Sequence, residues 1–129
     1  AREISNTEAM PQLTQHLRTA SVLLVVCLDL SSIAALDKDL SRISLASGGS
    51  IYPLVWNILL AARAEGYGGT MTTISLAVEP QIKELLEIPE NWALATLVPM
   101  GKPVKQLTKL KRKPVEEFVV RDTFNGSSF

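Results

Sequence analysis

The sequence predicts a layered domain of helices and strands, of the α/β or α+β class, on three observations. With 129 residues and a hydrophobic content of 47%, the chain suffices for one globular core but not for two ordinary domains. Two apolar runs of strand length, 21–28 and 92–100, lack the polar alternation of a half-exposed strand. Helical patterns separate them, which gives the order helix, strand, helix, strand, helix, strand, tail.

The first third of the chain contains a helix, a strand and an ambiguous segment. Residues 1–18 have the composition of a polar helix, and Pro11 favours a late start with this proline in the first turn. The run 21–28 predicts a strand that is buried on both faces. Residues 31–47 are rich in charged side chains and predict a short exposed helix before a Gly-Gly break.

Residues 50–65 carry the clearest helical pattern. We expect Ser50 to cap the N-terminus and Gly66 to end the helix in the left-handed conformation. Trp56 and Leu60 lie off the main apolar stripe, which predicts a helix that is buried on more than one face, at the core or at a subunit interface. The stripe consists of Ile51, Leu54, Val55, Ile58, Leu59 and Ala62.

The second half alternates extended and helical segments. Residues 68–75 read as a strand or extended segment, 79–87 as a short helix, and 92–100 as a second apolar strand. Residues 102–129 have no helical period and predict an extended C-terminal tail. The inward side chains of the short helix are expected to be Ile82, Leu85 and Leu86.

Charge is divided along the chain although the total cancels. Residues 1–101 carry 6 basic and 10 acidic side chains, whereas 102–129 carry 7 basic and 3 acidic ones. Six of those seven basic residues lie in 102–113 without an acid among them. Overall neutrality argues against a general nucleic-acid or membrane-surface binder but leaves room for a local basic site.

Several kinds of chemistry are excluded or disfavoured. The only cysteine, Cys27, rules out an internal disulfide and a cysteine-rich zinc site, and we expect it to be inert core packing. The only histidine, His16, has no partners for a His-based metal site, so no metal is predicted. A Ser-His-Asp triad would have to use His16, but no Gly-x-Ser-x-Gly elbow is present, and an exposed or hydrogen-bonded helix histidine is the favoured interpretation. The hard chemistry of an enzyme with this sequence would belong to a bound cofactor. Two acidic pairs are interpreted as solvated surface, namely Asp37 with Asp39 and Glu116 with Glu117.

Neither a membrane helix nor a secretory signal is evident. The longest apolar run, 21–28, is too short to cross a bilayer as a helix. No charged and then apolar segment opens the chain. We therefore expect a soluble, cytoplasmic protein that needs no membrane.

Three groups of motifs occur in a fixed order. The first is Asn57-Ile-Leu-Leu-Ala-Ala, which runs on to Gly66-Tyr-Gly-Gly. The second is Thr70-Met-Thr-Thr, followed by Ile88-Pro and by a strand that ends Val98-Pro-Met-Gly-Lys-Pro. The third is Lys111-Arg-Lys-Pro-Val-Glu-Glu. Each motif alone is weak, but the ordered set over roughly residues 50–120 resembles the C-terminal half of the FMN-dependent nitroreductase family, which includes iodotyrosine deiodinase.

This resemblance implies both a fold and an activity. The fold is α+β, a mixed sheet flanked by helices, with residues 1–129 as a single partial domain and 102–129 as a tail that embraces a second subunit. The protein would be a homodimer with FMN at its interface. NAD(P)H would reduce the flavin, which would pass electrons to a small-molecule acceptor such as a nitroaromatic or a quinone. The protein would thus provide no catalytic side chain of its own.

The resemblance also assigns cofactor-binding residues. Met71, Thr72 and Thr73 match the segment that lies against the flavin ring, where short side chains and free backbone amides can hydrogen-bond its edge. Arg112 matches the tail arginine that reaches the FMN phosphate, with Lys111 or Lys113 as the alternatives.

Tyr52 and Trp56 admit several interpretations. They could line the substrate side or the dimer interface, although aromatic residues on such a helix are more often core.

The chain also departs from the family pattern. Nothing in it matches the Arg-rich N-terminal cluster that binds the FMN phosphate in full-length members, so we expect either a fragment of a longer protein or a naturally shortened homologue. A flavin-less dimeric binding module, or an inactive remnant of the same fold, is therefore the alternative function. Nucleic-acid binding through 102–113 is a third hypothesis, disfavoured because the basic run has no interleaved aromatic residues.

Overall fold

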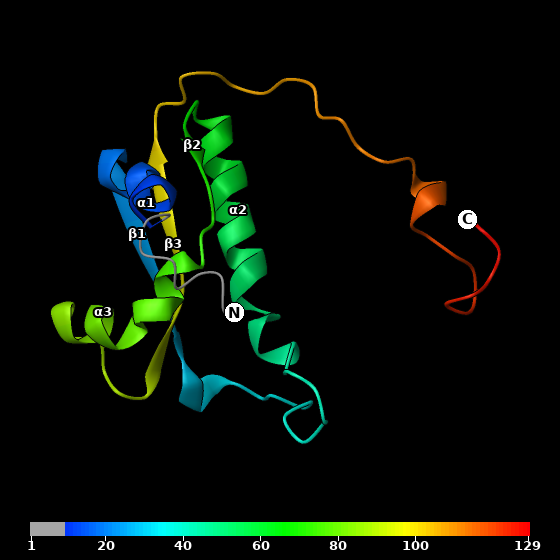
Figure 1. Ribbon diagram of the computed structural model, residues 1–129, viewed down its shortest axis with the longest axis horizontal. Coiled ribbons are helices and arrows are strands. Elements are labelled where there is room, and N and C mark those ends of the chain that lie inside the picture. The colour runs from blue at the N-terminus through cyan, green and yellow to red at the C-terminus, as the bar shows by residue number, and fades with distance from the viewer. Residues whose placement is uncertain (1–9) are drawn as a thin grey trace.

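A computed structural model describes residues 10–129 of the chain (Figure 1). The predicted order of helices and strands is confirmed, and the tail follows the last strand. Within the described residues, none of the helices is both long and apolar enough to cross a membrane. The elements are α1 (Met10–Thr19), β1 (Val22–Asp29), α2 (Ile51–Ala64), β2 (Gly68–Gly69), α3 (Glu79–Leu85) and β3 (Trp92–Gly101).

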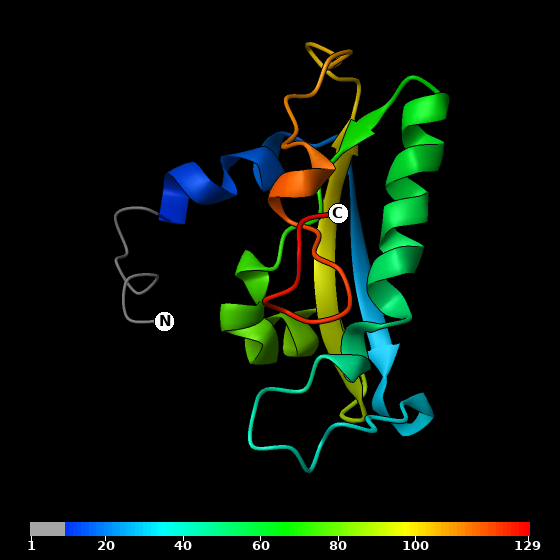
Figure 2. The ribbon, with the colours of Figure 1, turned by 90° about the vertical axis from the view of Figure 1, so that its right-hand side faces the viewer.

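The three strands form one sheet in the order β1-β3-β2. β1 pairs with β3 antiparallel from Val22 opposite Met100 to Asp29 opposite Trp92, with one irregularity after Val26. The two-residue strand β2 pairs antiparallel with the other edge of β3. α2 lies on one side of the strands, and α1 and α3 lie on the other (Figure 2). The predicted α+β class is confirmed, and all strand pairs in the described chain are antiparallel.

The core lies between β3 and α2. Six consecutive residues of β3, 94–99, are buried, because this strand is central and has neighbours on both edges. From α2, Ile51 and Val55 join this core, one turn apart on the predicted stripe. The second apolar strand thus forms where the sequence predicts it, and its central position buries it.

The predicted burial of the first apolar strand is wrong for this chain. β1 forms where expected, but Val22 is 50% exposed and Leu23 is 42% exposed. The reason is its position, because β1 is an edge strand with only β3 beside it. A continuous apolar run identifies a strand without showing what covers its faces.

The predicted helix in 31–47 is also wrong. Its place is taken by turns and two short 3₁₀ segments, Leu30–Ser32 and Ala46–Gly48. Asp37 organises this loop, because its carboxylate accepts hydrogen bonds from Ser44 Oγ at 2.6 Å and from the Leu45 N–H at 2.8 Å. The interpretation of Asp37 as solvated surface is wrong, since the side chain is buried in the loop that it holds.

The ends of the helices follow the sequence in part. Gly66 has φ +82° and ends α2 as expected, because glycine adopts this left-handed conformation without steric cost. Ser50 precedes α2, but its side chain makes no capping hydrogen bond. In α3 it is Lys83 rather than Leu85 that turns inward, and Lys83 Nζ donates to the backbone oxygens of Glu90 and Trp92. Leu86 is likewise exposed, so the predicted inward face of α3 is only partly correct.

The tail leaves the end of β3 and stands away from the body of the molecule (Figure 1). Residues 102–114 contain no helix or strand, and a single 3₁₀ turn, Val115–Glu117, follows. Near the end of the tail, Val120 and Ser128 form an isolated antiparallel bridge.

Candidate functional site

The segment that follows β2 runs beside β3 as an incomplete strand. The Thr70 N–H donates to the Pro99 oxygen at 3.3 Å, and the Thr72 N–H donates to the Leu97 oxygen at 3.0 Å. The Leu97 N–H returns a hydrogen bond of 3.0 Å to the Thr72 oxygen. The even-numbered residues of this segment are thus tied to the sheet.

The odd-numbered residues of the same segment point their amides elsewhere. Because hydrogen-bonding directions alternate along an extended chain, the N–H groups of Met71 and Thr73 turn away from β3. Neither of them donates a hydrogen bond to any part of the chain that the structure describes. The expectation of free amides over Met71, Thr72 and Thr73 is therefore wrong for Thr72, whose N–H is used by the sheet.

Buried contacts hold this segment in place. Thr96, fully buried in β3, donates from Oγ1 to the Thr72 oxygen at 2.8 Å. Gly69 packs so tightly that a Cβ there would lie 2.9 Å from Leu59 Cδ2 and 3.0 Å from Met100 Cγ. The position of Met71 is consequently set by a rigid strand on one side and by α2 on the other.

Met71 borders an apolar hollow between α2 and the start of the tail. The hollow measures about 660 Å³, within the range of about 300–1,000 Å³ that small-molecule sites occupy. Met71 is 39% exposed and Trp56 is 59% exposed, so apolar surface is available to a flat ligand. The apolar lining consists of Trp56, Leu59, Leu60, Met71, Leu107 and Leu110.

Arg112 lies further along the tail and is exposed. It borders neither the hollow beside Met71 nor the basic hollow described below, so within one chain the structure does not bring the two predicted parts of the site together. Of its neighbours, Lys113 faces Glu117 at 3.9 Å, and both are largely exposed. The Arg112 guanidinium makes no ion pair with any carboxylate in the described residues.

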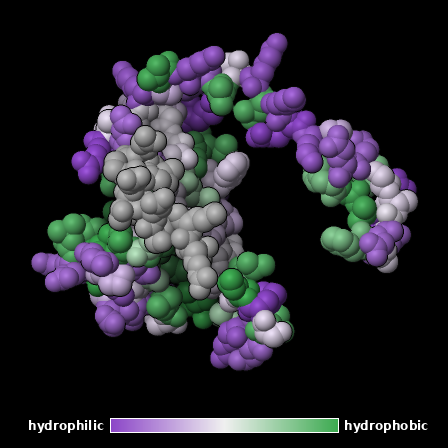
Figure 3. Space-filling model, viewed as in Figure 1, coloured by the Kyte–Doolittle hydropathy of each residue, from purple (hydrophilic) through white to green (hydrophobic). Residues whose placement is uncertain are grey.

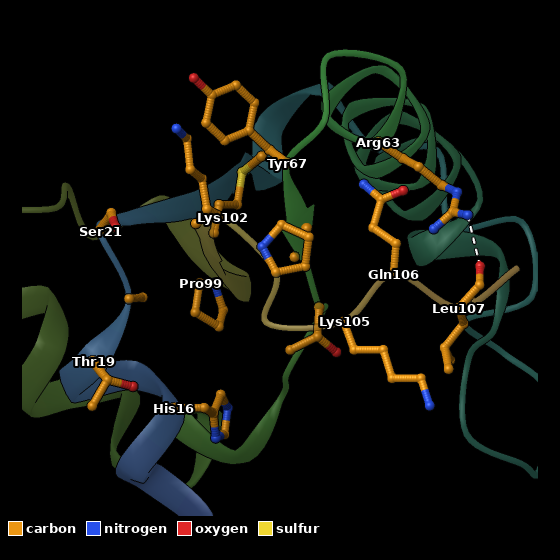
Figure 4. A pocket seen from close by; sticks show the side chains of 17 residues that line it. His16, Thr19, Ser21, Arg63, Tyr67, Pro99, Lys102, Lys105, Gln106 and Leu107 are labelled. Atoms are coloured by element: carbon orange, nitrogen blue, oxygen red, sulfur yellow. Dashed lines mark hydrogen bonds between the residues drawn. The ribbon is translucent and has the colours of Figure 1, made fainter.

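A second hollow, of about 450 Å³, lies where the tail leaves β3 (Figure 4). We call it the basic hollow, because His16, Arg63, Lys102 and Lys105 border it together with Tyr67. The basic run after residue 101 is visible in the sequence, but the contributions of His16 from α1 and Arg63 from α2 to this hollow are not. Only the excess of lysine after residue 101 pointed to it.

The remaining singled-out residues have structural positions. Cys27 is half-buried in β1, and burial raises the pKa of its thiol, which lowers the fraction of the reactive thiolate. His16 is exposed at the rim of the basic hollow. Tyr52 and Trp56 are exposed on α2, and Tyr52 covers Gly48. Residues 10–129 contain no cluster of side chains suited to hold a metal ion.

Comparison with known proteins places this geometry in a family. A sequence model described as the nitroreductase family matches residues 3–102. The chain belongs to the nitroreductase family. The predicted resemblance is thereby confirmed, and the match covers β1 to β3, including the segment at Met71.

Individual relatives agree with this nitroreductase assignment. Human iodotyrosine deiodinase 1 is 32% identical over 108 residues, which are 82% of this chain and 36% of the human protein. The NADPH:FMN oxidoreductase from Vibrio harveyi, solved with NAD⁺, superposes with a TM-score of 0.66 at 25% identity, over 93% of this chain and 56% of that one. An oxidoreductase from Bacteroides fragilis has a TM-score of 0.68 at 16% identity, over 98% and 55%, and supports the fold alone. The chain thus spans about a third of the human relative and little more than half of these structures.

Proposed function

We propose that this chain is part of an FMN-dependent oxidoreductase of the nitroreductase type that works as a homodimer. In this proposal Met71, Thr72 and Thr73 lie against the flavin ring, and Arg112 binds the FMN phosphate. NAD(P)H is the reductant, and a nitroaromatic, a quinone or a similar molecule is the electron acceptor. Bound FMN would supply the redox chemistry, hydride acceptance from the nicotinamide and electron transfer to the acceptor, while these residues would hold and orient it.

One observation carries the proposal. The backbone N–H groups of Met71 and Thr73 make no hydrogen bond within the described chain, and Met71 borders an apolar hollow. Such donors fit the polar edge of a flat aromatic ring, and the apolar lining fits its faces. Donors held in place by the sheet stabilise negative charge on that edge without reorganising, and so raise the electron affinity of the ring.

The phosphate assignment rests on chemistry and on family position. The guanidinium of Arg112 has no carboxylate partner in the described chain and offers a planar fork that suits phosphate. The tail stands away from the body of its own chain (Figure 1), which supports a role for the tail at a site formed with a second subunit. The exposed apolar side chains of Trp56 and Leu60 on α2 support the same dimer.

The first test is a flavin titration of the purified full chain, followed by its visible absorption and its quenched flavin fluorescence. We expect a bound-flavin spectrum, and Arg112→Ala should weaken FMN about tenfold or more, since a charge-assisted hydrogen bond is worth roughly 1.5–3 kcal/mol. Arg121→Ala is the matched control, because Arg121 is another tail arginine, placed over the Phe129 ring at 5.6 Å. A chain that stays colourless in excess FMN would contradict the assignment of Met71, Thr72, Thr73 and Arg112 as a sufficient flavin site.

Acceptors are then compared in one assay. NADPH oxidation is followed with FMN present and with a nitroaromatic, a quinone or an iodinated tyrosine added. The iodinated tyrosine is included because two relatives are named iodotyrosine deiodinases. Flavin-dependent oxidation with any of them supports the proposal.

The alternative function is a flavin-less dimeric binding module of the same fold. The exposed apolar surface of β1 and α2 favours it, because that surface suits association whether or not flavin binds. A stable dimer in sedimentation that leaves NADPH unoxidised, with and without FMN, would establish this alternative.

A further inference from the structure

The basic hollow has no role in the function proposed above. Arg63 comes from the end of α2, while Lys102 and Lys105 come from the first residues of the tail. Tyr67, 46% exposed, stands beside them at the start of β2. Figure 4 shows Lys102 and Tyr67 on one side of the hollow and Arg63 and Lys105 on another.

The positive charge of this hollow is not neutralised within the described chain. No aspartate or glutamate among the described side chains borders it. The described residues form two ion pairs, Arg42–Asp37 and Lys113–Glu117, and neither involves a cation of the basic hollow. Figure 3 shows hydrophilic residues, with hydrophobic ones between them, at the end of the molecule where the tail departs. Like charges around one depression repel each other, so an anion that enters it relieves that repulsion.

The shape of the hollow is fixed by contacts between α2, β2 and the tail. Arg63 Nη2 donates to the Leu107 oxygen at 2.7 Å, which anchors the tail and leaves other guanidinium donors for a ligand. A Cβ at Gly68 would lie 3.2 Å from Pro103 Cβ, so β2 and the tail are in close contact there. Lys102 and Lys105 are exposed, and the flexible stem of a lysine allows its ammonium group to reach a group bound in the hollow.

The neighbourhood of the hollow connects it to the proposed flavin site. Gly69 and Thr70 border both the basic hollow and the apolar hollow that contains Met71. A ligand that spans the two would place an anionic end among the cations and a second end beside the proposed flavin ring. The aromatic face of Tyr67 provides a stacking surface for a nucleobase at the anionic end, an interaction worth roughly 1–3 kcal/mol.

We propose that the basic hollow binds the phosphate monoester of an adenine nucleotide, and that this nucleotide is the phosphorylated reductant NADPH rather than NADH. Arg63, Lys102 and Lys105 contact the 2′-phosphate, and Tyr67 stacks on the adenine. Cationic side chains are the general means by which proteins distinguish the 2′-phosphate from a free hydroxyl. The choice of reductant rests on the function proposed above, whereas the phosphate site itself does not.

The test measures nucleotide binding without flavin or turnover. Adenosine 2′,5′-bisphosphate and adenosine 5′-monophosphate are titrated into the full chain by calorimetry, with inorganic phosphate as a competitor. We expect the bisphosphate to bind at least about tenfold more tightly, and its affinity to fall as salt rises. Lys102→Ala with Lys105→Ala should remove that preference, whereas Lys38→Ala, in the exposed loop before α2, should retain it.

The same variants separate this phosphate from that of FMN. The lysine double variant should bind FMN like the unaltered chain, while Arg112→Ala should lose FMN and keep the preference for the bisphosphate. Equal binding of the two adenosine nucleotides, or loss of the preference in Arg112→Ala alone, would overturn the phosphate site. Failure of FMN binding with the preference intact would contradict only the proposed flavin function. In that case the phosphate site stands and the choice of NADPH falls.

Discussion

β1 and β3 are neighbouring strands of similar apolar composition that differ in burial. They pair over eight positions of β1, and both were predicted as apolar strands, β1 as one that is buried on both faces. Residues 94–99 of β3 are all buried, while Val22, Leu23 and Val25 of β1 are between 36% and 50% exposed. The difference comes from sheet order, because β3 is central and β1 forms an edge.

This contrast shows what an apolar run does and does not specify. Composition makes both segments strands, because β-branched and aliphatic side chains favour an extended backbone that packs. Burial depends in addition on which elements lie over each face, and those elements can belong to another part of the assembly. The exposed apolar side of β1 therefore agrees with a chain that spans about half of each similar structure.

The largest predicted effect compares leucines on the two strands. Leu97→Ala in β3 should lower the free energy of unfolding by about 2–5 kcal/mol, because a buried leucine leaves a cavity. Leu23→Ala in β1 should cost less than about 1 kcal/mol, because much of that side chain is already in water. Urea denaturation followed by circular dichroism measures both variants.

The same pair of variants reports on what covers β1 in solution. If Leu23→Ala proves as costly as Leu97→Ala, and more costly at high protein concentration, a second subunit covers the edge strand. If Leu97→Ala costs no more than Leu23→Ala and both costs are small, the assignment of β3 to the core is wrong.

The second effect concerns the close packing beside the proposed ring segment. Gly69→Ala introduces a Cβ within 3.0 Å of the Leu59 and Met100 side chains, so either these side chains or β2 must shift. The expected loss of stability is about 1–3 kcal/mol, as for other overpacked sites. Gly66→Ala provides the contrast, because no heavy atom lies within 4 Å of its Cβ position and only the strain of φ +82° opposes it. An unaltered unfolding midpoint for Gly69→Ala would contradict the described contacts.

Sequence reasoning succeeded where local chemistry decides. Gly66 ends α2 because glycine alone adopts its φ freely, and Pro11 falls in the first turn of α1 because its missing N–H costs nothing there. It failed where distant residues decide. The loop at 31–47 looks helical by composition, yet Asp37 binds backbone N–H groups eight and nine residues away. No periodicity contains that information.

The candidate site shows the same division. The order of the motifs predicted the family, and this prediction is confirmed. It could succeed because each motif is a short contiguous stretch of sequence. The roles of Met71, Thr73 and Arg112 remain predictions. The Thr72 N–H donates to Leu97 of β3 because the two segments pair. The sequence of this segment alone does not reveal that pairing. The basic hollow joins three separated elements, and only its two lysines were visible as part of a charged run.

The third effect is a pH dependence at the loop that precedes α2. Hydrogen bonds from Ser44, from the Leu45 N–H and from Arg42 hold the pKa of the Asp37 carboxyl well below its usual value of 3.8. The ionised form therefore stabilises the fold above about pH 4, and this contribution is lost progressively as the pH falls below that value. Asp37→Asn should be less stable than the unaltered chain at pH 7.

The gap between Asp37→Asn and the unaltered chain should narrow as the pH falls from 4 toward 2. Thermal unfolding across that range measures it. Asp39→Asn is the control, since no hydrogen bond to its side chain exists in the described structure. A gap that is constant with pH would mean that the charge of Asp37 does not contribute.

The smallest effect concerns the attachment of the tail, which contains neither strand nor helix over 102–114. A hydrogen bond of 2.7 Å from Arg63 Nη2 to the Leu107 oxygen joins it to α2, and both groups are exposed to solvent. Arg63→Ala should therefore leave global stability nearly unchanged but ease local opening of the tail by about 1 kcal/mol. Hydrogen exchange of the amides around Leu107 should accelerate about fivefold, while those of β3 stay protected. Arg18→Ala, on the exposed side of α1, should alter neither region. Equal exchange around Leu107 in the two variants would show that the tail is held by other contacts, such as those of a second subunit.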